Sequence, residues 1–271
     1  TPGKTRRPHH LRKCQGPPVS NIAADLLPQT EDFSRYEFKY LVRQVLCDEI
    51  ENEVRHFMSY DGHVHPEFAN RYPVRSLYFD NADADCYYEK IDGIKTRRKF
   101  RIRTYGTAPA KDLPIYLEEK GRHNNRTYKH RIPMRAEDLC LLERPDRCMD
   151  LLDIYPNTPL IKTFVSDVIR RQLNPVVLVD YLRRPYTSVF DMNFRLTFDS
   201  TLSSAKADVL HPPATVPRYL SKAGWTILEV KFHRRIPAWF HRILQAHELT
   251  RLSISKYCKG MEICGLAVDL T

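Results

Sequence analysis

The sequence predicts an α+β fold in which a closed β-barrel with a polar, basic lumen is covered on its outside by helices. Three observations lead to this prediction: short alternating segments between helical stretches, strands with one apolar and one charged face, and a Glu-x-Lys pattern that occurs three times. The chain has 271 residues, 42% of them hydrophobic and 28% charged, which is typical of an ordinary folded protein. One barrel domain can fill this length.

Residues 1–30 show no hydrophobic period. They carry five basic residues against one acid, Asp25, together with five prolines, so we expect a disordered basic arm. The formal net charge of the chain is +10, and the arm accounts for less than half of it. Most of the positive charge therefore belongs to a single folded domain over residues 31–271.

Eight segments alternate in the manner of strands, and at least three others have a helical period. The predicted strands are Arg35–Val42, Val74–Asp80, Ile94–Tyr105, Ile115–Lys120, Arg126–Pro133, Val176–Arg183, Asn193–Asp199 and Trp225–Phe232. Apolar stripes predict helices from Val45 to Met58 and from Leu160 to Ile169, and a weaker pattern covers Ala136–Glu143. Pro159 and Pro237 stand where helices commonly begin, the second before Trp239–Leu249.

One face of the segment Ile94–Tyr105 is entirely cationic, because side chains two residues apart share a face of a strand. Its odd positions are Lys95, Arg97, Lys99, Arg101 and Arg103, whereas Phe100 and Ile102 stand on the other face. A single basic strand of this kind is more often a solvated outer surface. The repetition of charged faces elsewhere favours an enclosed site.

The Glu-x-Lys pairs place a carboxylate and an ammonium on one face of a strand, at Glu37-x-Lys39, Glu118-x-Lys120 and Glu229-x-Lys231. In Trp225–Phe232 the face opposite Glu229 and Lys231 is too apolar to meet water, and the charged face begins with Trp225 and Ile227, which also indicate burial, so we expect both faces to be enclosed. Arg195 and Thr197 share a face of their strand, and so do Tyr181 and Arg183. Strands with one apolar and one charged face, both enclosed, describe a barrel with a polar lumen.

A lumen with more Lys and Arg than Glu calls for an anionic ligand, because each isolated buried charge costs several kcal/mol. The carboxylates have two possible roles. They could pair with the cations, or they could hold a divalent cation that bridges phosphate oxygens. For a single glutamate the two roles are equally open, and for the set of three we expect at least one metal ligand.

Other classes of site are absent from the sequence. The chain has nine glycines and no glycine-rich phosphate loop, and it has no apolar run of the roughly 18 residues that a membrane-spanning helix needs. The seven cysteines include no Cys-x-x-Cys pair, so we expect free thiols in a reducing, cytoplasmic compartment rather than disulfides or a zinc site.

Seven motifs, in order along Arg35–Gly260, give the chain a family resemblance. They are R-Y-E-F-K-Y-L-V at 35–42, V-R-S-L-Y-F-D at 74–80, R-R-K-F-R-I-R-T-Y at 97–105, L-E-E-K at 117–120, V-D-Y-L-R-R-P-Y at 179–186, I-L-E-V-K-F at 227–232 and S-I-S-K-Y at 253–257. With them the chain resembles the catalytic domain of the vacuolar transporter chaperone (VTC) family of polyphosphate polymerases, within the triphosphate tunnel metalloenzymes.

The resemblance implies an eight-stranded antiparallel tunnel that binds ATP and, with Mn²⁺ or Mg²⁺, transfers its terminal phosphate to a growing inorganic polyphosphate chain. It implies phosphate ligands at Lys39, Arg101, Arg103, Lys120, Arg195, Lys231, Ser255 and Lys256, with Lys129 and Arg131 extending the basic lining. Tyr181 and Arg183 match an aromatic and a basic position, although a shifted register would exchange Arg183 for Arg184. Glu229 would be the principal metal ligand, helped by Glu37 and Glu118.

The sequence also departs from its relatives. The larger eukaryotic members carry a phosphate-sensing domain and membrane helices that are absent here, so we expect a free-standing version whose membrane partner, if any, is not visible. Arg35 stands where the triphosphatase branch of the superfamily has a further glutamate, which favours phosphoryl transfer over hydrolysis.

Two alternatives stay open at this point: a triphosphatase of the same fold, and a non-catalytic protein that binds polyphosphate. Nucleic acid is not the expected partner. Proteins that bind single strands interleave aromatic platforms with cations, and here the cationic strands carry glutamates instead.

Overall fold

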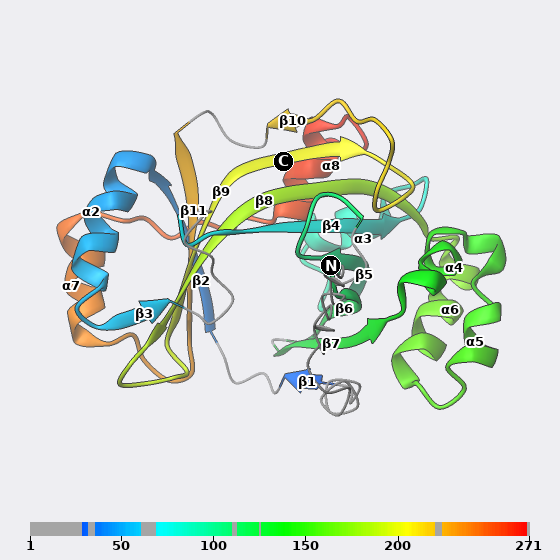
Figure 1. The fold of residues 1–271 in the computed structure, drawn as a ribbon, viewed down its shortest axis with the longest axis horizontal. Coiled ribbons are helices and arrows are strands. Elements are labelled where there is room, and N and C mark those ends of the chain that lie inside the picture. The colour runs from blue at the N-terminus through cyan, green and yellow to red at the C-terminus, as the bar shows by residue number, and fades with distance from the viewer. Residues whose placement is uncertain are drawn as a thin grey trace, which may run out of the picture.

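In the described part of the chain the sheet contains eleven strands, and every neighbouring pair is antiparallel (Figure 1). The computed structural model describes residues 29–31, 36–60, 69–109, 113–124, 126–219 and 224–269. The predicted arm over residues 1–30 lies outside this range except for residues 29 and 30, which belong to a short strand. Arg35, at the start of the first predicted strand, also lies outside it.

Eight long strands correspond one to one to the eight that the sequence predicts, with ends that differ by a few residues. They are β2 (Tyr36–Arg43), β4 (Tyr72–Asp80), β5 (Thr96–Thr104), β6 (Ile115–His123), β7 (Arg126–Met134), β8 (Asn174–Ser188), β9 (Arg195–Lys206) and β11 (Trp225–Phe232). Three short strands were not foreseen: β1 (Gln29–Glu31), β3 (Met58–Tyr60) and β10 (Arg218–Tyr219). The α+β antiparallel fold is confirmed.

The helices are α2 (Gln44–Val54), α3 (Asp85–Ile91), α4 (Leu139–Glu143), α5 (Asp150–Ile154), α6 (Pro159–Arg171), α7 (Ala238–Ala246) and α8 (Lys256–Ile263). Short 3₁₀ turns cover Ala136–Asp138 and Pro145–Arg147. The prediction for 45–58 is wrong at its end, because Met58 opens β3 as an edge strand on β8. Helices α3, α5 and α8 are too short to show a clear helical period in the sequence.

Strand order along the sheet is β1-β7-β6-β5-β4-β8-β9-β11-β2, with β3 and β10 attached at the side. The described strands show no pairing between β2 and β7, so the hydrogen-bonded ladder is open there instead of fully closed. Short segments cover the two edges. β1 pairs with β7, and beside β2 the Leu252 amide donates to the Lys39 carbonyl at 2.8 Å. Inside, Lys120 of β6 and Glu37 of β2 meet at 3.6 Å across this opening.

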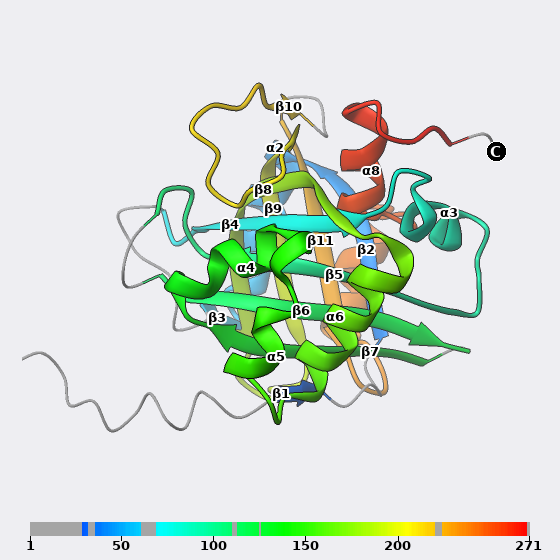
Figure 2. The same cartoon turned by 90° about the vertical axis from the view of Figure 1, so that its right-hand side faces the viewer.

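Two apolar cores are formed where helices pack on the sheet, and the larger one also includes the contacts of α8 (Lys256–Ile263). Helices α2 and α7 cover β2 and β11 on one side, and α4, α5 and α6 cover the outer face of β5, β6 and β7 on the other (Figures 1 and 2). Phe164 of α6 packs edge-on against Phe79 and Phe100, and Phe240 of α7 packs against Phe194. The outward, apolar faces of these strands are thereby buried against the helices, and the charged faces turn toward the lumen.

Helix α8 is the exception, because it packs against the inner surface of β8 and β9. A Cβ on Gly260 would lie 3.2 Å from Val179, so glycine allows this close approach. The approach brings the first residue of the helix, Lys256, into the lumen. No helix in the described part of the chain is long and apolar enough to cross a membrane.

Candidate functional site

A cavity of about 980 Å³ lies inside the curved sheet and is lined by residues of all eight long strands and of α8. The lining contains every site residue predicted from the sequence except Glu118. It includes Glu37, Lys39, Arg101, Arg103, Lys120, Lys129, Arg131, Tyr181, Arg183, Arg195, Glu229, Lys231, Ser255 and Lys256. The structure thus brings together residues that are more than 200 positions apart in the sequence.

Strand pairing explains why the Glu-x-Lys pattern recurs. Strands β2 and β11 run antiparallel with Glu229 opposite Lys39 and Lys231 opposite Glu37, so each carboxylate meets an ammonium on the neighbouring strand. Strand β6 places Glu118 opposite Arg101 of β5 and Arg131 of β7. Directly opposed charges of unlike sign stabilise a strand pair.

The lumen has two halves with different charge. We call the lumen side of β5, β6 and β7 the β5–β7 half, and the lumen side of β2, β9 and β11, with residues 181–185 of β8 and the start of α8, the β2–β11 half.

In the β5–β7 half, one carboxylate pairs with several cations. Glu118 is 1% exposed and accepts a hydrogen bond from Arg101 Nε at 2.7 Å, with Lys129 Nζ at 3.1 Å. Arg103 lies deeper in the wall, where its guanidinium donates to neutral hydroxyls, Ser76 Oγ at 3.0 Å and Tyr181 Oη at 3.2 Å. Its nearest distance to Glu118 is 4.0 Å. The positive charge of Arg103 is therefore only weakly compensated.

In the β2–β11 half, carboxylates and cations alternate at contact distance. Lys256 Nζ lies 2.5 Å from Glu229 Oε1 and 2.6 Å from Asp199 Oδ2. Arg183 donates two hydrogen bonds to Asp199, each at 2.7 Å, and a third to Glu229 at 3.2 Å. Lys39 Nζ lies 3.0 Å from Glu37 and 3.6 Å from Glu229. This network fixes the lumen end of α8 against β9 and β11.

The three predicted acidic ligands are all held ionised. Lys120, ahead of the opposing effect of burial, lowers the pKa of Glu37. Burial alone would raise the pKa of Glu229, but Lys256, Lys39 and Arg183 outweigh it and the pKa lies well below its usual value. Arg101, Arg103 and Lys129 do the same for Glu118. All three side chains are negative at neutral pH.

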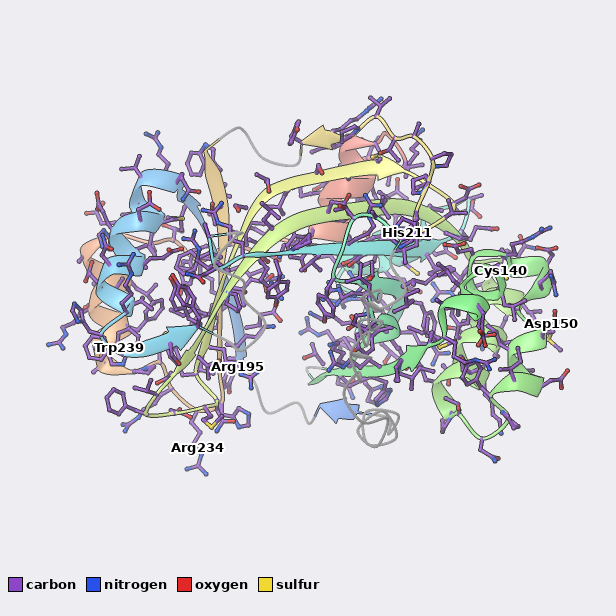
Figure 3. All side chains as sticks on the ribbon, in the orientation of Figure 1. Cys140, Asp150, Arg195, His211, Arg234 and Trp239 are labelled. Atoms are coloured by element: carbon purple, nitrogen blue, oxygen red, sulfur yellow. The ribbon has the colours of Figure 1, made fainter. Side chains whose placement is uncertain are left out.

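The remaining predicted residues stand at the edges of these two halves. Lys120 keeps 44% of its side chain exposed, the Arg131 guanidinium lies 4.8 Å from the Tyr116 ring, and Arg195 is opposite Lys231 at one end of β9 (Figure 3). Ser255 lines the cavity and caps α8, its hydroxyl accepting a hydrogen bond from the Cys258 amide at 3.3 Å. Arg184 pairs with Glu51 on the outer face, so Arg183 is the lumen residue.

A divalent cation would find carboxylate oxygens at Glu37 and Glu229, which both line the cavity. No group of three potential ligands among His, Cys, Asp and Glu occurs in the described ranges. Mg²⁺ is commonly bound through one or two carboxylates together with substrate phosphates, so two glutamates facing a phosphate site fit such an ion. Glu118 does not fit, because it is 1% exposed and contributes nothing to the cavity lining. Its geometry favours the ion-pair role.

Several residues of the lumen and its wall were not chosen from the sequence, and three of them, Lys99, Tyr78 and the buried Asp199, contact or interact electrostatically with the predicted site residues. Lys99 belongs to the cationic face that the sequence shows, and it lies over the Tyr257 ring at 4.5 Å. The hydroxyl of Tyr78 accepts a hydrogen bond from Arg101 at 2.8 Å. Asp199 ends the predicted strand Asn193–Asp199 on the same face as Arg195, and the alternation rule could have found it. Tyr78 shares the alternation of β4, but nothing in its sequence neighbourhood sets it apart.

Burial and neighbouring charges bring the pKa values of two of these groups, Lys99 and Tyr78, close to neutral pH. Burial lowers the pKa of Lys99 to about 8, aided by the repulsion of Lys120 and Arg101. For Tyr78 burial acts in the opposite direction, yet Arg101, Arg103 and Lys99 lower the pKa of the phenol to about 8.

Comparison with known proteins assigns the chain to a family. The VTC domain family model matches residues 34–264. Subunit 4 of the vacuolar transporter chaperone complex of Schizosaccharomyces pombe is 22% identical over 289 residues, a match that covers 92% of this chain and 40% of the relative. The chain therefore spans less than half the length of that protein.

Two solved structures show a distant likeness. A Bacillus halodurans protein described as a candidate adenylate cyclase is 14% identical with a TM-score of 0.47, covering 83% of this chain and 95% of its own. A protein of Pyrococcus horikoshii is also 14% identical, with a TM-score of 0.38 and coverage of 79% and 86%. On the match of the family model over most of its length, the chain belongs to the VTC domain family.

Proposed function

We propose that the protein is a polyphosphate polymerase that transfers the terminal phosphate of ATP to a growing inorganic polyphosphate chain inside the lumen. The observation that carries this proposal is the excess of cations over carboxylates in an enclosed cavity. Burying so many like charges is costly unless a polyanion compensates them, and a phosphate chain presents charge along its whole length. Membership of the VTC domain family and the likeness to a vacuolar transporter chaperone subunit support it.

The lumen cations would bind and orient the triphosphate. Arg103 offers a guanidinium that pairs only at 4.0 Å with a carboxylate, and Lys120 offers an exposed ammonium. Charge-assisted hydrogen bonds of this type are the stronger ones in proteins. The N-terminus of α8 points into the same cavity, and helix N-termini favour anions.

The reaction asks little of the protein beyond position and charge. A terminal phosphate oxygen of the polyphosphate chain attacks the γ-phosphorus of ATP, the bond from that phosphorus to the β,γ-bridging oxygen breaks, and ADP leaves with that oxygen. Lumen cations stabilise the negative charge on the transferred group, so no protein nucleophile is needed.

Mn²⁺ or Mg²⁺, held by Glu37 and Glu229 together with phosphate oxygens, would neutralise charge on the transferred phosphate and orient it. For the chain's own part, the Lys39 ammonium lies between these two carboxylates and offsets their mutual repulsion, and Lys256 anchors Glu229. We assign the protein to a reducing, cytoplasmic compartment, a proposal supported by the six described cysteines, which are all free thiols.

The test is direct. The purified chain is incubated with ATP, Mn²⁺ or Mg²⁺ and a short polyphosphate primer, and the products are resolved on a polyacrylamide gel that separates polyphosphates. We expect a ladder of long chains together with ADP. Release of orthophosphate without chains would show that the protein is a triphosphatase and not a polymerase. Binding of polyphosphate without any product would show that it is a non-catalytic polyphosphate-binding protein.

A further inference from the structure

One end of the cavity is bounded by aromatic and apolar side chains, in contrast to the basic lining elsewhere. We call it the tyrosine end, and it consists of Tyr72, Pro73, Tyr105, Leu113, Pro114 and Tyr116. These residues come from the start of β4, the end of β5 and the start of β6, so three neighbouring strands contribute to one rim. The centroid of the Tyr105 ring lies 5.8 Å from that of Tyr72 and 6.1 Å from that of Tyr116.

The other end of the same strands has a different lining. There the cavity is bounded by Lys90, Arg97, Gly121, Arg122 and Thr127, together with Glu89. The Tyr257 ring also lines the cavity near this end, but Lys99 lies over it at 4.5 Å and its hydroxyl donates to Asp80. A polyanion alone needs cations at both ends. The cluster of three partly accessible rings at the tyrosine end therefore indicates a ligand with a flat, apolar part on that side.

The tyrosine end lies directly beside the phosphate-binding candidates. Tyr116 is opposite Arg103 in the strand register, and Tyr105 follows Arg103 by two residues, which is about 7 Å along a strand. Arg131 lies over the Tyr116 ring, with its guanidinium carbon 4.8 Å from the ring centroid. A group bound by Arg103 therefore has aromatic rings within the length of a ribose.

The three rings are only partly buried. Burial raises the pKa of Tyr72 to about 12, and all three tyrosines remain partly accessible. The loop after β5 is held close, because a Cβ on Gly106 would lie 2.2 Å from Leu113 Cδ1. Glycine at this position lets Leu113 fold over the rim next to the tyrosines.

We propose that the tyrosine end is the nucleobase subsite, in which the rings of Tyr105 and Tyr116 stack on the base of a nucleoside triphosphate whose phosphates lie along Arg103 in the lumen. This inference rests on the proposed function, since it assumes that the lumen binds a triphosphate. Every base has an aromatic face, so the subsite accepts all four nucleotides and favours the larger purines.

The native chain provides the first test. Isothermal titration at fixed pH and salt compares ATP, CTP, ribose 5-triphosphate and inorganic tripolyphosphate. We expect ATP to bind at least fivefold more tightly than ribose 5-triphosphate, with CTP in between. Equal affinities of ATP and ribose 5-triphosphate would overturn the subsite.

Variants then locate the effect. Tyr105→Leu and Tyr116→Leu should each weaken ATP binding by roughly 5- to 100-fold while tripolyphosphate affinity changes less than twofold. Tyr105→Phe and Tyr116→Phe keep the rings and should keep the ATP preference. Tyr36→Leu is the matched control, because Tyr36 also lines the cavity but lies on β2 against Phe232.

The outcomes separate the two proposals. If the leucine variants weaken ATP and tripolyphosphate equally, the rings only shape the lumen and the subsite is wrong. If Tyr36→Leu removes the ATP preference instead, the base binds elsewhere and the subsite is again wrong. If tripolyphosphate does not bind to the native chain at all, the proposed function itself fails.

Discussion

The β5–β7 half of the lumen carries eight basic side chains against one carboxylate, Glu118, which is sealed in the wall. They are Arg97, Lys99, Arg101, Arg103, Lys120, Arg122, Lys129 and Arg131. Arg98 also borders the cavity, but its guanidinium pairs with Asp167 of α6 on the outer side and is not counted. The β2–β11 half carries five, namely Lys39, Arg183, Arg195, Lys231 and Lys256, against Glu37 and Glu229 in the lining and Asp199 buried behind them. The same Glu-x-Lys pattern thus serves two purposes. In one half it supports an electropositive wall, and in the other it builds a nearly balanced network that can accommodate a divalent cation.

The largest effect expected from this difference concerns Glu229. Glu229→Gln keeps the shape of the side chain but removes the charge that a hard cation requires, so polymer formation should fall by about 100-fold or more. Triphosphate binding should persist, because an anion is lost from the site. Gel analysis of the products and calorimetry with tripolyphosphate measure the two quantities.

The matched variant in the other half is Glu118→Gln. Because Glu118 pairs with cations inside the wall, its loss should lower the melting temperature without changing the manganese dependence of the reaction. If Glu229→Gln made polymer at nearly the parent rate with unchanged manganese dependence, Glu229 would be only an ion-pair partner. The proposed difference in role between the two halves of the lumen would then be wrong.

The next effect concerns the electropositive half. Arg103→Ala and Lys120→Ala each delete a cation facing the lumen, where a charge-assisted hydrogen bond contributes about 1.5–3 kcal/mol. Tripolyphosphate affinity should fall roughly 10- to 150-fold. Arg144→Ala is the control, since Arg144 forms an exposed ion pair with Asp146 at 3.4 Å. Calorimetry at moderate salt checks this, and an equal loss with Arg144→Ala would indicate a surface site.

A smaller effect should follow from pH. The pKa values of Lys99 and Tyr78 both lie at about 8, so raising the pH from 7 to 9 removes a positive charge and adds a negative one in the same wall. Both changes weaken the attraction for a polyanion, and tripolyphosphate affinity should fall through this range by about tenfold. A Lys99→Met, Tyr78→Phe double variant should show a flatter profile. A double variant with the parent profile would assign the titration to other groups.

The smallest effect is expected from the N-terminal residues. A chain that begins at residue 29 keeps β1 on β7 and loses five basic residues. Its tripolyphosphate affinity at 0.15 M salt should stay within twofold of the parent, because charges in water are screened beyond a Debye length of about 8 Å. A loss as large as that of Lys120→Ala would place the arm in the binding site.

Much of the fold could be predicted because the sequence alternates so regularly. In β5, Arg101 and Arg103 turn into the lumen while Phe100 and Ile102 pack under α6, as the period of two requires. The edges could not be predicted in this way. The short strand β1 and the segment at Leu252 are too brief to carry a period, yet they occupy the edges where a closed barrel would have joined.

The candidate site was predictable for the same reason, with one limit. Alternation tells which side chains share a face, but it does not tell how deep each one lies. Glu118 and Glu229 have similar sequence surroundings, and only the structure shows that cations seal Glu118 in the wall whereas Glu229 lines the cavity. Tyr78 and Lys99 acquire their shifted pKa values from residues on other strands, which no local pattern reveals.

The central claim is that phosphoryl transfer takes place inside this lumen. The most direct measurement follows the label from ATP carrying ³²P in its γ-phosphate into polyphosphate, for the parent chain, Arg103→Ala and Arg144→Ala under identical conditions. We predict labelled chains from the parent and from Arg144→Ala and almost none from Arg103→Ala. Equal labelling of chains by all three proteins, or label found only in orthophosphate, would contradict the claim.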